Sequence, residues 1–195
     1  MPWIMQNSLS DNRALYWEMV DNDNKEVIYI EGLSMADFIP DESLWPLHFR
    51  QTTKHKNIPD FMTGTNIGMR FVSRAFRDLI EEWDPGHSAY VPIILNLADG
   101  RTLQDEYFIH CFTDFIDDGL IEDQSDIGAI IRKGRMRFYS SSANPKLTWQ
   151  SEKIKGRHVW ADKYLMDRFC VSDEFMQAVD DRGYALFKKI QSFAI

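Results

Sequence analysis

The chain contains few cysteines, so disulfide bonds can contribute little to its stability. Only two of the 195 residues are cysteines, Cys111 and Cys170, and that number is too small for a disulfide framework. Both lie in apolar stretches of sequence, so we expect two small buried thiols in a reducing cytosol.

Long apolar runs are also missing. No stretch approaches the roughly 20 apolar residues that a membrane-spanning helix requires, so we expect no membrane contact. The opening residues, MPWIMQNSLSDNRALYW, lack a basic region followed by an apolar region and do not resemble a secretory signal. The sequence therefore predicts a cytoplasmic protein, with an N-terminal tail over residues 1–12.

Basic residues are fewer than acidic residues in this chain. The chain has 22 Lys and Arg against 30 Asp and Glu, which gives a net charge of −8. Non-specific nucleic-acid binding needs a positive surface, so this class of partner is disfavoured. An acidic exterior suits solubility, or a basic partner that is attracted by the field of the protein.

The common motifs of enzyme and metal sites are absent from the sequence. The five histidines show neither HxxxH nor HExxH spacing, the cysteines form no CxxC pair, and there is no GxSxG nucleophile motif. The glycine-containing segment 64–68 lacks the Lys and Ser/Thr of a phosphate-binding loop. We therefore predict no cofactor, no metal and no catalytic residue. The alternatives are an enzyme with a dispersed site around His110, Asp114 or His158, or a scaffold or regulatory subunit.

The sequence does contain many hydrophobic and aromatic residues, which can form a core. Hydrophobic residues make up 44% of the chain and aromatic residues 13%, which is enough for one folded domain over residues 1–195. The clearest helix follows Ser73, whose hydroxyl is placed to cap the first turn. Apolar residues then recur at helical spacing from Phe76 to Trp83, and Pro85-Gly86 ends the helix.

Two long strands follow this helix. Residues 89–97 and 104–112 are rich in Val, Ile, Tyr and Phe, and Asp99-Gly100 between them favours a tight hairpin. A second unit from Phe169 to Gly183 repeats the order of apolar run, Val-Ser, Phe and helix, with Ser172 as the predicted cap. We interpret this as a repeated local solution rather than a duplication. Further strands are predicted at 13–21, 26–31, 46–52, 147–154, 158–161 and 184–190, with a helical turn within 32–40.

These elements indicate an α+β fold, with mostly antiparallel sheets, a few packed helices and two short strand–helix–strand units. The segment 113–127, TDFIDDGLIEDQSDI, is strongly acidic. Its spacing fails the pattern of a calcium-binding EF-hand, since the twelfth position from Asp114 is Ser125 and not Glu. It is either a solvated loop or a partner-binding patch. The basic run from Arg132 to Arg137 follows it directly and is interpreted as a strand edge or loop, with no assigned role.

The order of motifs over residues 13–190 resembles immunity protein family eleven of bacterial polymorphic toxin systems, formerly catalogued as a domain of unknown function. The matching positions are short and spread along the chain: Asp60-Phe61, Val72-Ser73, Phe76 to Leu79, Trp83-Asp84-Pro85-Gly86, Val91-Pro92-Ile93, Asp114 to Asp117 and on to Ser125, Gly156, His158-Val159-Trp160, Val171-Ser172, Phe175, Gly183 and Leu186-Phe187.

This resemblance implies a small cytoplasmic protein that neutralises a cognate toxin by binding it, and no enzyme, metal or cofactor. Clustered charge suggests which surface a basic toxin would meet. We predict two candidate sets of toxin-binding residues. The first is Asp114, Asp117, Asp118, Glu122 and Asp123, and the second is Asp78, Glu81 and Glu82.

Overall fold

The structure is a computed structural model, in which residues 1–7, 17–20, 39, 41–52, 58–63, 69–132, 135–139, 145–163, 165, 168–184 and 187–195 are described. Strands dominate these residues, and the helices are few. This confirms the α+β class that the sequence predicts. The predicted strand at 26–31 and nearly all of the predicted turn within 32–40 lie outside the described residues.

The large sheet has six strands, in the order β2-β3-β6-β7-β5-β4. These strands are β2 (Trp17–Met19), β3 (Leu47–Gln51), β4 (Phe61–Thr63), β5 (Arg70–Ser73), β6 (Ser88–Asn96) and β7 (Thr102–Phe112). The pairs are antiparallel except for β3 and β6, which run parallel. The sheet is therefore mixed, although antiparallel pairing prevails in it.

The hairpin at the centre of the large sheet forms where the sequence predicts it. Gly100 has a φ of +90°, which the missing Cβ permits, and Leu97 and Arg101 close the turn with a 2.8 Å backbone hydrogen bond. Farther along, Ile93 faces Tyr107 while Leu95 faces Leu103, so β7 carries a bulge between these two pairs.

The small sheet has four strands in the order β11-β12-β1-β13, and all of its pairs are antiparallel. They are β1 (Trp3–Asn7), β11 (Val159–Trp160), β12 (Phe169–Val171) and β13 (Phe187–Gln191). Residues 3–7 thus form an inner strand, where the sequence predicts part of an N-terminal tail. Its contacts span the length of the chain: the Trp3 indole donates to Asp173 at 2.7 Å, and Ile4 pairs with both Cys170 and Ile190.

The predicted strand 147–154 is only partly correct. Thr148–Trp149 form β10, which pairs in parallel with β14 (Phe193–Ala194), but Ser151–Ile154 form the short helix α3. Just after β10, the backbone N–H of Gln150 binds the carbonyl of Gly119 at 2.8 Å, beside the antiparallel bridge between Trp149 and Leu120.

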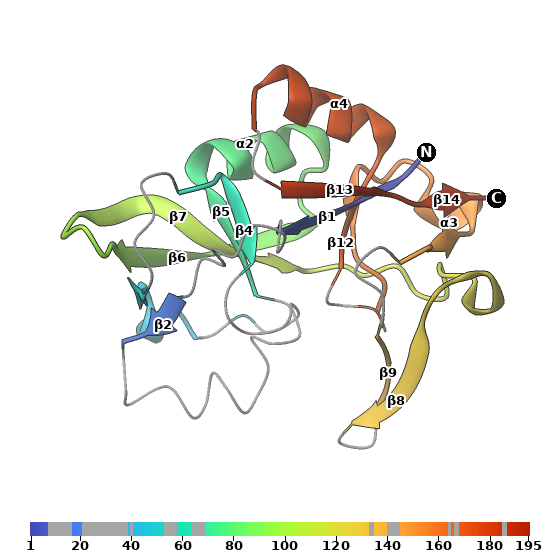
Figure 1. Ribbon diagram of the computed structural model, residues 1–195, viewed down its shortest axis with the longest axis horizontal. Coiled ribbons are helices and arrows are strands. Elements are labelled where there is room, and N and C mark those ends of the chain that lie inside the picture. Colours follow the sequence, from blue (N-terminus) through green and yellow to red (C-terminus); the bar gives the residue numbers. More distant parts are fainter. Residues whose placement is uncertain are drawn as a thin grey trace.

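The two predicted helices are confirmed with their caps. Helix α2 (Arg74–Trp83) begins after Ser73, whose Oγ accepts the N–H of Phe76, and α4 (Asp173–Asp181) begins after Ser172, whose Oγ accepts the N–H of Phe175, both at 3.1 Å. The helices lie side by side at the top of Figure 1. The rings of Phe76 and Phe175 pack edge to face, with their centroids 6.2 Å apart. The two similar sequence units therefore form one helical layer.

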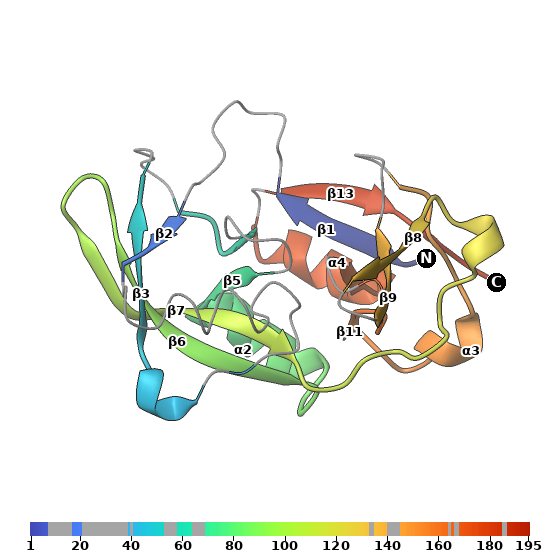
Figure 2. The ribbon, with the colours of Figure 1, turned by 90° about the horizontal axis from the view of Figure 1, so that it is seen from below.

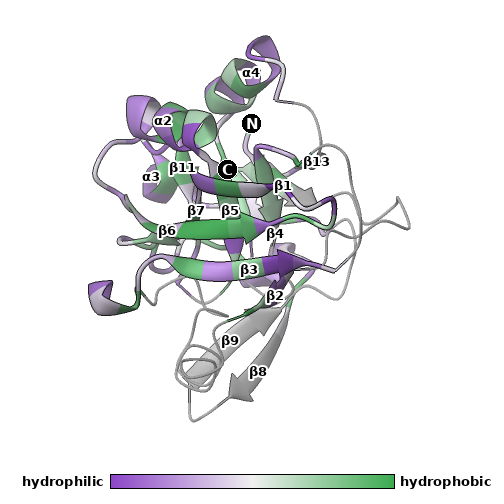
Figure 3. Ribbon diagram, turned by 90° about the vertical axis from the view of Figure 1, so that its left-hand side faces the viewer, coloured by the Kyte–Doolittle hydropathy of each residue, from purple (hydrophilic) through white to green (hydrophobic). Residues whose placement is uncertain are grey.

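Three apolar clusters make up the core. One lies on the large sheet around Phe71 and Ile109, a second lies between the helical layer and the sheets around Phe76 and Phe169, and a third lies around Trp149 and the small sheet. Figure 3 shows apolar residues along the strands and polar residues on the outer sides of the helices. Cys111 and Cys170 are both buried and unbridged, as the sequence predicts.

The hairpin formed by β8 (Gly128–Arg132) and β9 (Arg135–Tyr139) contains the basic run. Its two strands pair with each other in a sheet of their own. Figure 1 shows the hairpin apart from the two larger sheets. The basic run is therefore a hairpin of the protein and not an edge of either larger sheet.

Candidate partner-binding surface

The acidic segment 113–127, here called the acidic strap, is an ordered connection whose backbone is fixed at several points. The N–H of Ile116 binds the carbonyl of Ala161 at 3.0 Å, and the N–H of Ile121 binds the carbonyl of Thr148 at 2.8 Å. Near its end, the N–H of Asp126 binds the carbonyl of Lys146 at 2.8 Å. The strap includes the single 3-10 turn η3 (Glu122–Gln124). These bonds hold its carboxylates in fixed positions on the surface.

The apolar residues of the strap hold it against the body of the protein. Ile116 and Leu120 are buried in the third core cluster with Trp149 and Trp160. Gly119 lies between them, and a Cβ at that position would stand 2.2 Å from Cγ2 of Ile116. Only glycine lets the backbone pass so close to this side chain.

We expect Gly119→Ala to destabilise the protein by about 1–3 kcal/mol, because an added methyl group must displace the Ile116 side chain. Urea unfolding measures the effect. The double variant Gly119→Ala/Ile116→Ala removes Cγ2 and should show a favourable coupling between the two changes. Simple additivity of the two single losses would contradict the close approach.

The structure divides the first predicted set of carboxylates into two kinds. Asp114 pairs with Arg157 at 2.7 Å, and Asp117 pairs with Lys163 at 2.8 Å. Asp118, Glu122 and Asp123 are exposed and have no ion-pair partner among the described residues. Within this first set, the negative charge that has no ion-pair partner among the described residues therefore lies on Asp118, Glu122 and Asp123.

The second predicted set lies on α2, apart from the strap. Asp78 pairs with its neighbour Arg77, and Glu82 pairs with Arg182 at the end of α4, both at 2.7 Å. Glu81 is half-buried. Burial, followed by the nearby Glu81 carboxylate, raises the pKa of the Tyr90 hydroxyl. Figures 1 and 2 show α2 in the helical layer and the strap beyond the far end of the sheets, so the structure does not join the two sets into one patch.

A polar cluster that the sequence did not predict holds the start of the strap in place. The side chain of Asp84 is 6% exposed, and its Oδ2 accepts the backbone N–H groups of His158 at 3.1 Å and Val159 at 2.9 Å. Arg157 lies beside it, with Nε 3.6 Å from Asp84 Oδ2 and Nη1 bonded to Asp114. The cluster therefore connects the end of α2, the strap and the start of β11.

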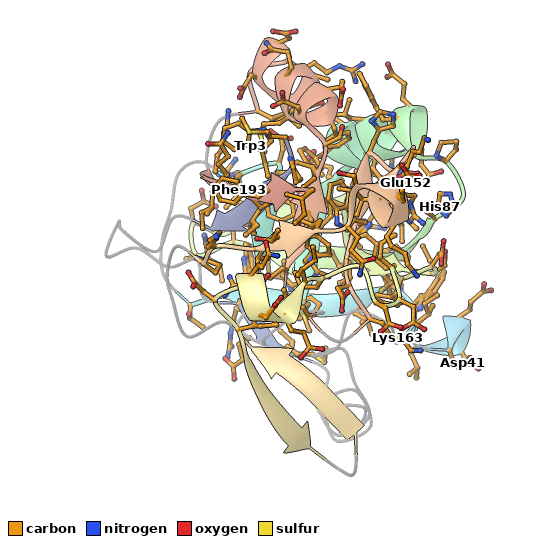
Figure 4. The ribbon with its side chains drawn as sticks, turned by 90° about the vertical axis from the view of Figure 1, so that its right-hand side faces the viewer. Trp3, Asp41, His87, Glu152, Lys163 and Phe193 are labelled. Atoms are coloured by element: carbon orange, nitrogen blue, oxygen red, sulfur yellow. The ribbon has the colours of Figure 1, made fainter. Side chains whose placement is uncertain are left out.

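His87 also belongs to this cluster and lies on its solvent-exposed side. Its Nδ1 lies 3.3 Å from Asp114 Oδ2 and its Nε2 lies 3.7 Å from Asp84 Oδ1. Figure 4 shows His87 on the same side of the molecule as Glu152 and Lys163. The sequence signals were present, since Asp84 lies in WDPG and Arg157 in GRHVW, but neither motif indicates that the two meet.

The three residues named for an enzymatic alternative do not come together as one site. Asp114 belongs to the polar cluster, and the ring of His158 lies against Trp83 with its Nδ1 3.0 Å from Ser172 Oγ. His110 is fully buried in β7, where Nε2 lies 2.8 Å from Ser88 Oγ. In the described part of the chain, no group of three or more His, Cys, Asp or Glu side chains is placed so that it could hold a metal ion, and this includes the polar cluster.

His110 makes the stability of the protein dependent on pH. Burial, and then the charge of Arg70, lower the pKa of His110 well below 6.5. In the unfolded chain its pKa returns to about 6.5, so unfolding takes up a proton below that pH. The stabilisation is complete above the unfolded pKa and is lost as the pH falls toward the folded value.

We therefore expect the free energy of unfolding to fall below pH 6.5 with a contribution from His110 of up to about 1.4 kcal/mol per pH unit. Urea unfolding between pH 7.5 and 5 measures the total slope. The variant His110→Gln cannot take up this proton, so its slope should be shallower. Equal slopes for the two proteins would show that His110 is not held neutral.

None of the described helices has both the length and the apolar composition that crossing a membrane demands. Residues 18–192 match the model of the family described as Immunity protein family (Imm11). No curated protein matches the chain.

Proposed function

This chain belongs to the immunity protein family Imm11, and from that membership we propose that it binds a cognate bacterial toxin and blocks it. The observation that carries the proposal is the match over residues 18–192, which includes nearly all of the described elements. The protein acts by covering the toxin and transforms no substrate of its own. It needs no cofactor for this role.

The acidic strap is the surface that we propose for the toxin. Two features support it: the backbone of the strap is tied to residues 146–150 and 161–163, and Asp118, Glu122 and Asp123 project from it without a described ion-pair partner. A rigid surface loses little conformational entropy on binding. Its charge attracts a basic active cleft from a distance and raises the association rate.

The nature of the toxin follows from this charge. A cleft that is complementary to the strap is basic, as in proteins that act on nucleic acids or nucleotides. We propose that such a toxin acts in the cytoplasm and that the immunity protein meets it there. The two buried cysteines, which form no disulfide, suit a reducing compartment.

The carboxylates on α2 are the less favoured surface. Asp78 and Glu82 already have ion-pair partners in Arg77 and Arg182, and Glu81 is half-buried. A toxin that bound there would have to compete with these pairs. The same three residues therefore provide a control for the strap.

We expect the triple variant Asp118→Lys/Glu122→Lys/Asp123→Lys to associate with the toxin at least about tenfold more slowly at low ionic strength, because it loses electrostatic attraction. The probe is the purified cognate toxin domain, and surface plasmon resonance measures the rate and the dissociation constant.

The matched control reverses the second set, Asp78→Lys/Glu81→Lys/Glu82→Lys. It changes the net charge of the protein by the same amount, so it separates a local effect from a general one. Near-normal association of the control supports the strap. If the strap variant keeps the original dissociation constant, the strap does not contact the toxin.

A further inference from the structure

We draw no further inference here: the strongest candidate, the polar side-chain cluster around Asp84, His87 and Arg157 where the end of α2, the acidic strap and the start of β11 meet, belongs to the surface already described, and nothing among the described residues shows a ligand or partner that would bind to it.

Discussion

Replacing Asp84 with alanine should cost about 3 kcal/mol or more of the free energy of unfolding. The carboxylate accepts two backbone N–H groups, from His158 and Val159, and lies beside the guanidinium of Arg157. Each donor that is left unsatisfied in a buried site costs about 1–3 kcal/mol, and a nearby cation that loses its buried counter-charge adds to this cost. Urea unfolding at pH 7.5 measures the loss.

The matched control for this prediction is Asp114→Asn. Asp114 binds the same Arg157, but its side chain is 52% exposed, and exposed ion pairs contribute about 0–1 kcal/mol. Amide exchange at His158 and Val159 should quicken in Asp84→Ala and stay slow in the control. Equal losses of stability in the two variants would show that Asp84 does not hold β11 to the end of α2.

We expect Phe76→Ala to destabilise the protein by about 3–5 kcal/mol, because it removes a fully buried ring from the centre of the second core cluster. The centroid of the Phe76 ring lies 5.7 Å from that of Phe61, 6.2 Å from that of Phe175 and 5.4 Å from that of Tyr184. Phe76 therefore connects α2 with β4 and with α4. The melting temperature and the urea midpoint should both fall sharply.

Phe193→Ala serves as the comparison for this core substitution. Phe193 is 43% exposed on β14, so its removal should cost less than about 1 kcal/mol. The cavity in Phe76→Ala lies between the helices, and amide exchange in α4 should therefore rise more than in β6. A small effect of Phe76→Ala would mean that the two helices do not share a core.

The parts of the fold that depend on neighbouring residues could be predicted from the sequence. A serine three residues before a phenylalanine determines where α2 and α4 begin, since the hydroxyl reaches only the first turn. The turn at Asp99-Gly100 is local in the same way, because it needs a positive φ at the glycine.

Elements that depend on distant partners could not be predicted. Strand β1 has little local signal, and it forms because β12 and β13 lie on its two sides. Likewise, Asp84 and Val159 are 75 residues apart, and no spacing rule connects them. Residues 151–154 form α3 although their sequence favours a strand, and the pairing partners of β10, which are β14 and Leu120, are distant in the sequence.

The candidate partner-binding surface could likewise be predicted from the sequence only in part. Clustered charge in the sequence indicated both acidic sets, because composition is local information. Which carboxylates stay unpaired depends on Arg157, Lys163 and Arg182, and these residues reach the acidic sets only in the folded protein. Of the five carboxylates in the first set, Asp118, Glu122 and Asp123 are the ones without an ion-pair partner among the described residues.

Titration of the natural protein into the active toxin domain tests the central claim most directly, which is that this protein acts by covering a toxin. The rate of the toxin reaction is followed while the immunity protein is added in steps. We expect the rate to fall in proportion to the added protein and to reach zero near equimolar amounts. An unchanged rate at large excess, or a reaction that the immunity protein carries out by itself on the toxin or its substrate, would contradict the account.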